Sequence, residues 1–389
     1  MSAPAPAPSS PPPFIAGEAP ATWNALPFAE RVIRWQRVHG RHGLPWQRTR
    51  EPYRVWLSEI MLQQTQVATV LGYYARFLER FPTVADLARA PSEDVLALWS
   101  GLGYYARARN LHRCAQVVVG EHGGEFPCTA AQLAALPGIG PSTAAAIAAF
   151  CFGERAAILD GNVKRVLTRV LAYEGDLSSA ASERELWSIA RGLLPGEAAD
   201  TDAGSDAAMA DYTQGLMDLG ATVCTSAKPA CDACPAATMC RAFAAGAPER
   251  FPVKTRRLKR GRRTGVLLWL QHGERVWLVR RGDAGVWAQL WSLPEFDTSM
   301  SLERAVQDWP GTLEWLPPFK HVLTHFDWML QPMRLQWHGS IGAAQQAEIE
   351  RLAAVDGTSV AAAGRWVSRA ELDTVGVPAP IRKLLEAGL

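Results

Sequence analysis

The stretch LPGIGPSTA at residues 136–144 decides how we expect this chain to fold. Two glycines one residue apart favour a tight turn, and Pro141 suits the first position of a helix, so the stretch predicts a turn between two helices. The backbone N–H groups of Gly138 and Gly140 would then point outward beside the positive end of the second helix, where they can hold a phosphate. An ordinary helix–helix connection explains the turn equally well, so neighbouring features have to decide.

The residues on both sides of this turn predict more helices. Phe28, Val32 and Trp35 recur at helical spacing, and so do the apolar residues within 163–170. We therefore expect an all-α domain over residues 23–245, preceded by a disordered leader at 1–22 that is rich in Pro and Ala.

The character of the sequence changes after this helical region. Residues 250–263 contain eight basic side chains and no acidic one, so we expect a charged linker over 246–263 that is either solvated or in contact with DNA phosphates. Residues 265–270 and 275–279 are short, largely apolar runs joined by a short turn, which predicts a β-hairpin. We expect a multi-domain chain, with an α+β domain over 264–389 after the helices.

Length and charge exclude several classes of protein. A chain of 389 residues has more than enough material for one core, which excludes a small disulfide-stapled scaffold. Its 40 Lys and Arg against 38 Asp and Glu give a net charge of +2, so any surface for nucleic acid must be local. Residues 126–153 are uncharged, but the sequence PGIGP at 137–141 breaks them into two short halves. We expect a cytoplasmic protein that does not contact membranes.

Four of the seven cysteines lie close together in the sequence, at Cys224, Cys231, Cys234 and Cys240. Thiolates are soft ligands that suit zinc or an iron–sulfur cluster, and the crowding favours a reducing compartment over a disulfide framework. The first gap, of six residues, departs from the paired cysteines usual in structural zinc sites, yet donor chemistry alone leaves both metals open. We expect the other cysteines, Cys114, Cys128 and Cys151, to pack in apolar cores.

Two isolated carboxylates suggest glycosidase chemistry. Glu59 lies within the apolar stretch 55–62, where loss of hydration favours the protonated form of a general acid. Asp160 follows the apolar run 156–159 and precedes a predicted helix, whose dipole favours the ionised form. One acid and one carboxylate can protonate a leaving group and stabilise an oxocarbenium-like sugar. On spacing alone, a helix cap at Asp160 and a satisfied acid on a helix flank at Glu59 are at least as good explanations.

The glycine hairpin, the turn LDGNV at 159–163 and the cysteine loop occur in one order and together resemble the helix-hairpin-helix DNA glycosylases. Within that superfamily, WLSEIMLQQTQV at 56–67 and GLGYYARARNL at 101–111 resemble the adenine DNA glycosylases of the MutY family. The resemblance runs from about Trp23 to the C-terminus. It implies base excision repair of adenine mispaired with 8-oxoguanine or guanine in duplex DNA, and one 4Fe-4S cluster on the four cysteines.

The resemblance also implies roles for the two carboxylates. Glu59 would protonate N7 of the flipped adenine, and Asp160 would stabilise the oxocarbenium ion or form a transient covalent adduct. In the related endonuclease III branch, a lysine that attacks the sugar occupies the position of Ser142. A hydroxyl with no adjacent base is a poor substitute for an amine, so we expect a monofunctional glycosylase that leaves an abasic site. Lys164 is expected to contact phosphate.

Further residues match family positions that contact DNA or the adenine. They are Gln63, Gln64 and Tyr104 for gap filling and contact with 8-oxoguanine, Leu44, Trp46 and Gln214 for the adenine pocket, and Asn162 beside the catalytic carboxylate. For the two aromatic residues, Trp46 and Tyr104, packing in the core is the alternative explanation.

The stretch GVWAQLWSLPEF at 285–296 resembles the Nudix-like 8-oxoguanine recognition domain of the same family. No cluster of glutamates follows that could hold Mg²⁺ around a pyrophosphate, so we expect binding without hydrolysis. Leu323 stands where the family commonly has Phe, and it precedes Thr324 and His325, which we expect to contact the lesion.

Other functions stay open at this point. They are a bifunctional oxidised-pyrimidine glycosylase, which Ser142 and the extra domain disfavour, a DNA-binding or redox-sensing protein without catalysis, and a Nudix nucleotide hydrolase. We expect a monomer that binds duplex DNA, with the basic linker as a candidate contact for other repair proteins.

Overall fold

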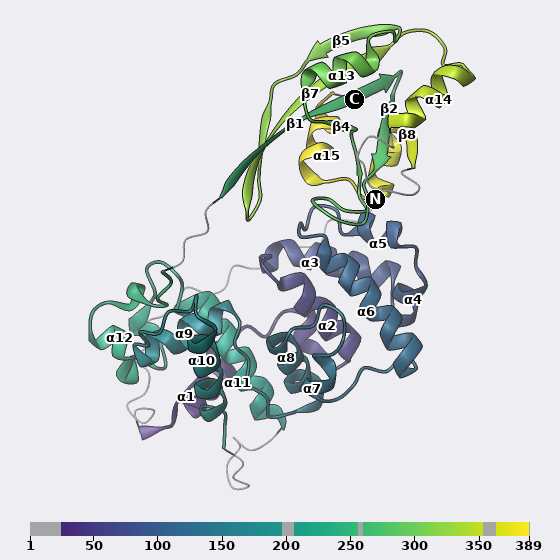
Figure 1. Cartoon of the computed structure of the whole chain (residues 1–389). Coiled ribbons are helices and arrows are strands. Elements are labelled where there is room, and N and C mark those ends of the chain that lie inside the picture. Colours follow the sequence, from purple (N-terminus) through teal and green to yellow (C-terminus); the bar gives the residue numbers. More distant parts are fainter. Residues whose placement is uncertain (1–24, 197–205, 256–259, 353–362, 389) are drawn as a thin grey trace, which may run out of the picture. The chain divides into compact units, whose positions relative to one another are not determined.

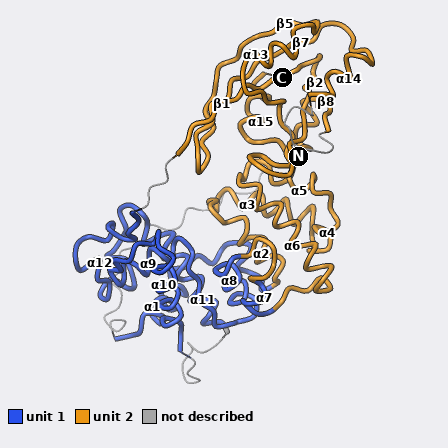
Figure 2. The backbone as a smooth tube through the Cα atoms, in the orientation of Figure 1, with its two compact units in different colours: residues 1–50, 128–133, 140–256 blue, residues 51–127, 134–139, 257–389 orange. Residues whose placement is uncertain are grey.

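The structure is a computed structural model that describes residues 25–196, 206–255, 260–352 and 363–388. The chain divides into two compact units (Figure 2). Unit 1 comprises residues 1–50, 128–133 and 140–256, and unit 2 comprises residues 51–127, 134–139 and 257–389. The predicted leader at 1–22 and residues 256–259 of the predicted linker lie outside the described residues.

Unit 1 is built from helices (Figure 1). Its core includes Val32, Val163 and Leu167, of which none is more than 1% exposed. The buried face of α8 is made almost entirely of alanine, and such small side chains allow neighbouring helices to approach closely. The elements are α1 (Phe28–His39), η2 (Pro45–Arg48), α7 (Ala130–Leu133), α8 (Pro141–Phe152), α9 (Gly161–Leu171), α10 (Ala180–Gly192), α11 (Asp206–Asp218), η4 (Leu219–Val223), η5 (Cys231–Ala233), η6 (Ala237–Met239), α12 (Arg241–Ala244) and η7 (Pro248–Arg250).

The turn between α7 and α8 confirms the local prediction from the glycine stretch. Pro141 is the first residue of α8 and Gly140 is its N-cap. Gly138 has a φ of +77°, and a Cβ at this position would lie 2.6 Å from the Cβ of Asn110. Both the backbone angle and the close neighbour therefore require glycine there.

The first part of unit 2 is also helical. It contains α2 (Pro52–Leu62), α3 (Val67–Arg80), α4 (Val84–Arg89), α5 (Ser92–Leu98) and α6 (Ala106–His122). The Glu51 side chain caps α2 by accepting from two backbone N–H groups, and Thr83 begins α4 with a capping box. The Phe77 and Trp99 rings meet edge to face at 5.8 Å between centroids, which anchors α3 against the end of α5.

The C-terminal part of unit 2 is a mixed sheet with helices, as predicted for an α+β domain. Strand β1 pairs with β2 as an antiparallel hairpin, which confirms the predicted turn, and runs parallel to β7 with Gly261 opposite Phe326. The sheet order is β3-β2-β1-β7-β5, with β4 on β1, β6 on β7 and β8 on β2. The elements are β1 (Gly261–His272), β2 (Arg275–Arg280), β3 (Trp291–Ser292), β4 (Glu295–Phe296), α13 (Ser299–Val306), β5 (Gly311–Trp315), β6 (Phe319–Val322), β7 (Phe326–Trp337), α14 (Ala343–Arg351), β8 (Gly364–Ser368), η9 (Arg369–Thr374) and α15 (Ala379–Gly388).

The uncharged stretch 126–153 folds as two short helices rather than one long one. Helix α7 ends at Leu133 and α8 begins at Pro141, because the intervening prolines and glycines interrupt helical hydrogen bonding. Among the residues that the structure describes, no helix has the length and apolar character needed to cross a membrane.

Candidate active site and metal centre

Asp160 is the N-cap of helix α9. Its Oδ1 accepts a hydrogen bond of 2.8 Å from the backbone N–H of Val163, and the residue is half-buried. The helix cap proposed as an alternative explanation is therefore real. Capping and chemistry are compatible, because the cap fixes the position of a carboxylate that still has a second oxygen.

The electrostatic environment of Asp160 differs from the one we expected. Burial raises the pKa of the Asp160 carboxyl above its ordinary value, and this effect exceeds the lowering by the N–H groups of Val163 and Asn162 and by Arg165 and Lys164. We expected the helix dipole to favour the ionised form, and the net direction is the opposite one. Sequence alone does not reveal how much water a residue loses on folding, and here loss of hydration dominates.

A second contact ties the hairpin to Asp160. The Oγ of Ser142, in the first turn of α8, accepts a hydrogen bond of 3.0 Å from the backbone N–H of Leu159. The hydroxyl thus fixes the residue directly before Asp160. This contact gives Ser142 a structural role in the described part of the chain.

Arg165 connects the start of α9 to the cysteine loop. Its Nη2 donates to the Oδ1 of Asn162 at 2.8 Å and to the carbonyl of Gly220 at 2.6 Å, while its Nε donates to the carbonyl of Cys224 at 2.7 Å. A Cβ on Gly220 would lie 2.6 Å from the Cβ of Asn162, so this approach requires glycine. Our sequence analysis missed Arg165, and the available signal was a long cationic side chain one helical turn after Asn162.

Lys164 is paired within unit 1. Its Nζ lies in hydrogen-bond contact with Oε1 of Glu183 on α10. The expected phosphate contact would have to compete with this ion pair.

The residues expected at the adenine pocket belong to unit 1. Leu44 is half-buried and is the N-cap of η2, whereas Trp46 is only 7% exposed, which agrees with the core-packing alternative for that ring. Gln214 on α11 donates from Nε2 to Oδ1 of Asp218 at 2.8 Å, and the fully buried Asp218 also pairs with Arg41. The side-chain amide of Gln214 is therefore held in one orientation.

Glu59, the expected general acid, lies in unit 2. It occupies the interior of α2 and is half-buried, with Trp56, Ile60 and Met61 close by in sequence and almost fully buried. These apolar neighbours agree with the environment predicted for Glu59.

Two loops of unit 2 present the expected DNA-contacting side chains. Gln63 is half-buried at the end of α2, and Gln64 is exposed with a φ of +58°. Tyr104 has a φ of +47° and is 53% exposed. Simple core packing is therefore the wrong explanation for Tyr104, because most of its side chain is accessible.

Thr324 and His325 lie at the turn between β6 and β7, and both are exposed. The backbone of this turn is fixed by a hydrogen bond of 2.9 Å from the N–H of Gly261 to the carbonyl of His325 and one of 2.8 Å from Arg260 to the carbonyl of Leu323. Leu323 itself is half-buried. The turn therefore offers its two polar side chains on a backbone held in place.

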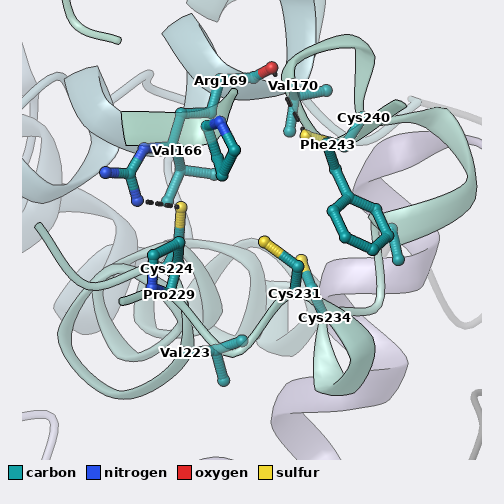
Figure 3. A pocket seen from close by; sticks show the side chains of 12 residues that line it. Val166, Arg169, Val170, Val223, Cys224, Pro229, Cys231, Cys234, Cys240 and Phe243 are labelled. Atoms are coloured by element: carbon teal, nitrogen blue, oxygen red, sulfur yellow. Dashed lines mark hydrogen bonds between the residues drawn. The ribbon is translucent and has the colours of Figure 1, made fainter. Parts of the chain in front are cut away.

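The four clustered cysteines line one pocket in unit 1 (Figure 3). Within the described part of the chain, no group of three or more His, Cys, Asp or Glu side chains is arranged to hold a metal ion. The rest of the lining is mostly apolar and includes Val166, Val170, Val223, Pro229 and Phe243.

Arg169 is the charged residue in this pocket. It is 2% exposed, and its Nη1 lies 3.4 Å from the Sγ of Cys224. The same guanidinium donates to the carbonyls of Thr225, Ser226 and Phe251. A buried cation beside sulfur suits a negatively charged group in the pocket.

The three other cysteines behave differently from one another. Cys114 is fully buried, as predicted. Cys151 is half-buried, and Cys128 is exposed. The prediction of core packing was therefore wrong for Cys128, which lies in the segment leading into α7.

Two known families match the chain and define its class. Residues 57–191 match the HhH-GPD superfamily base excision DNA repair proteins, and residues 265–387 match the NUDIX domain. The molecule is thus a helix-hairpin-helix base-excision repair protein with a C-terminal Nudix domain.

Relatives of nearly full length narrow the assignment. The adenine DNA glycosylase of Buchnera aphidicola subsp. Acyrthosiphon pisum is 32% identical over 366 residues, covering 92% of this chain and 97% of the relative. Human adenine DNA glycosylase is 32% identical over 423 residues, covering 92% of this chain and 73% of the relative. The chain belongs to the adenine DNA glycosylase family and is a hydrolase of N-glycosyl bonds. A solved structure of a thermostable thymine-DNA glycosylase shares 28% identity, with a TM-score of 0.48, over 56% of this chain and 95% of that one.

Proposed function

We propose that this enzyme removes adenine mispaired with 8-oxoguanine or guanine from duplex DNA and leaves an abasic site without cutting the strand. The observation that carries the proposal is the carboxylate of Asp160, capped at the start of α9 and fixed by the contact between Ser142 and Leu159. In the helix-hairpin-helix scaffold this is the residue we assign to the sugar.

The chemistry needs the adenine outside the base stack, because the glycosidic bond is inaccessible within it. We assign Glu59 as the general acid that protonates N7 of the extruded base and weakens the bond to the sugar. Asp160, when ionised, stabilises the positive charge that develops on the sugar or captures it as a transient adduct. Water then completes the hydrolysis.

The absence of strand cleavage is inferred from Ser142, at the position where the endonuclease III branch has the attacking lysine, and from Lys164, which lies four residues after Asp160. Strand cleavage by a glycosylase requires an amine that attacks the sugar. Ser142 offers a hydroxyl that accepts from Leu159, and Lys164 is paired with Glu183. Neither is a free amine.

We assign the four-cysteine pocket to one 4Fe-4S cluster. Thiolates bind both zinc and iron–sulfur clusters, and the membership in the adenine DNA glycosylase family favours the cluster. Four sulfurs around one largely apolar pocket, with the Arg169 guanidinium beside them, suit an anionic cluster. When bound, the cluster would cross-link the loop 224–240 and provide a redox-active group.

The remaining assignments concern DNA. We propose that the hairpin at Gly138 and Gly140 holds a phosphate, that Gln63, Gln64 and Tyr104 fill the gap, and that Thr324 and His325 contact 8-oxoguanine. Leu44, Trp46 and Gln214 are assigned to the adenine pocket, Asn162 to a place beside the catalytic carboxylate, and Lys164 to a phosphate contact. The domain limits proposed with them are 23–245 for the glycosylase, 246–263 for the linker and 264–389 for recognition.

The test is single-turnover release of adenine from a duplex with one adenine opposite 8-oxoguanine, analysed with and without alkali. We expect strand breaks only after alkali treatment, and none with an undamaged adenine–thymine duplex. Breaks without alkali would overturn the monofunctional assignment. Binding without adenine release would overturn the catalytic one.

A further inference from the structure

Arg107, in the first turn of α6, forms an unusual set of hydrogen bonds. Its acceptors come from two regions that are separate in sequence: the last turn of α2 with the loop that follows it, and the loop before α6. The Nη1 donates to the carbonyls of Ile60 and Met61, both at 2.9 Å, and to the carbonyl of Gln63. The Nη2 donates to the Oγ1 of Thr65 at 3.1 Å, to the carbonyl of Leu102 at 3.2 Å and to that of Gly103 at 3.4 Å.

These acceptors are uncharged, so the planar shape of the Arg107 guanidinium matters more here than pairing of opposite charges. Five are backbone carbonyls and one is a hydroxyl. Three of the carbonyls lie at the C-terminal end of α2, where the helix leaves its last carbonyl groups unpaired and the dipole is negative. A planar guanidinium can serve both loops at once, which a lysine ammonium on a flexible stem cannot do with the same geometry.

Both loops hold backbone conformations that non-glycine residues rarely adopt. Gln64 and Tyr104 have positive φ values of 58° and 47°, and Gly101 and Gly103 have values of 101° and 72°. Such conformations cost free energy and persist only where surrounding contacts fix them. Arg107 supplies contacts directly beside both strained positions.

Aromatic packing adds to the same arrangement. The guanidinium carbon of Arg107 lies 5.3 Å from the centre of the Trp99 ring and 5.7 Å from that of Tyr104. The indole Nε1 of Trp99 also donates to the carbonyl of Gly103 at 3.0 Å. Buried Leu102 and Tyr105 flank the exposed Tyr104, so the loop is anchored on both sides while one ring stays accessible.

We propose that Arg107 is a positioning residue that locks the 63–65 and 101–104 loops together, so that Gln64 and Tyr104 enter the DNA as one element. The inference rests on the proposed function, since it assumes that these two side chains contact the mismatch. We assign Arg107 no direct contact with the substrate, since the acceptors of its guanidinium are backbone carbonyls and the Thr65 hydroxyl. Its effect on base removal passes through the two loops.

The experiment measures the single-turnover rate of adenine release, with enzyme in saturating excess, for a duplex carrying adenine opposite 8-oxoguanine. Arg107→Lys keeps the positive charge but loses the planar fork, and we expect a loss on the order of 100-fold, since misplacement by about 1 Å has that effect. Arg113→Lys, at an exposed position of the same helix, is the matched control and should retain the wild-type rate.

A double-mutant cycle separates positioning from general stability. If Arg107 acts through the loops, then Arg107→Lys made in a Tyr104→Ala background should lower the rate by less than about threefold further. Thr65→Val removes one acceptor while leaving Arg107 intact, and it should give a smaller loss that is also not additive with Arg107→Lys. Thermal melting of each variant establishes that the compared proteins are folded.

The outcomes are distinct. A wild-type enzyme that releases no adenine would contradict the proposed function itself. A wild-type enzyme that does, together with an Arg107→Lys variant of equal rate or with fully additive losses in the cycle, would overturn the positioning role alone.

Discussion

Asp160 and Glu59 occupy two different kinds of position. Asp160 caps a helix, and hydrogen bonds and cations surround it. Glu59 lies in mid-helix beside nearly fully buried apolar residues of α2. The difference teaches that hydrogen-bond partners alone do not set the protonation of a carboxyl group, because burial raises the pKa of Asp160 despite its polar network.

The largest effect is expected for Asp160→Asn. Asparagine also caps helices well, so the fold should be retained while the negative charge is lost. We expect the single-turnover rate of adenine release to fall by at least about 10³-fold, because charge stabilisation of the transition state is removed. Binding of the mismatch duplex, measured by fluorescence anisotropy, should persist. An active Asp160→Asn enzyme would remove the basis for contrasting the two carboxyl groups.

Glu59→Gln is expected to have the next largest effect. The amide keeps the shape of the side chain but cannot donate a proton to N7, and loss of general-acid catalysis typically costs about 10²-fold or more. The rate should be restored in part for a substrate whose base is a better leaving group. Equal losses for both substrates would indicate that Glu59 has a different role.

Substitution of Arg165 tests the network around Asp160. Arg165→Met removes hydrogen bonds to Asn162, Gly220 and Cys224. We expect the free energy of unfolding, measured in urea, to fall by about 2–3 kcal/mol. Since Arg165 also lowers the pKa of Asp160, the acid limb of the activity profile should move to higher pH. Arg34→Met, at an exposed ion pair with Glu30, is the control and should change stability by less than about 0.5 kcal/mol.

The smallest expected effect is a change with pH in the melting temperature, caused by protonation of Asp160. Burial raises the pKa of Asp160 above its ordinary value of 3.8, so the folded state binds the proton more tightly than the unfolded chain. The resulting stabilisation is complete below the unfolded pKa and is lost as pH rises through the folded pKa. The melting temperature of the wild type should therefore decline relative to Asp160→Asn as pH is raised from about 4 through this interval. Parallel curves would contradict the raised pKa.

The rate of adenine release should depend on the protonation of Asp160 in the opposite direction from stability, rising rather than falling as pH increases. If Asp160 acts in its ionised form, the rate falls as pH decreases through its raised pKa. The measurement is the single-turnover rate against pH for the wild type and Arg165→Met. Stability and activity thus place conflicting demands on one carboxyl group, which is common where function requires a buried charge.

Much of the local structure could be predicted because it depends on short-range rules. The helix start at Pro141, the cap at Asp160 and the hairpin of β1 and β2 all follow from residues within a few positions of one another. The errors concern quantities that depend on the surroundings: the direction of the pKa of Asp160 and the exposure of Cys128. Hydration at a given residue is set by segments far away in the sequence, so no local pattern reports it.

The sequence by itself determined the succession of a helical region and an α+β domain, the glycine turn and the chemical types of the candidate site residues. Only the tertiary structure decided that the four cysteines line one pocket, that Arg165 links Asn162 to the cysteine loop, and that Arg107 joins two loops. The physical reason is that periodicity and capping act over a few residues, whereas the partners of a buried guanidinium or thiol are selected by packing between distant segments.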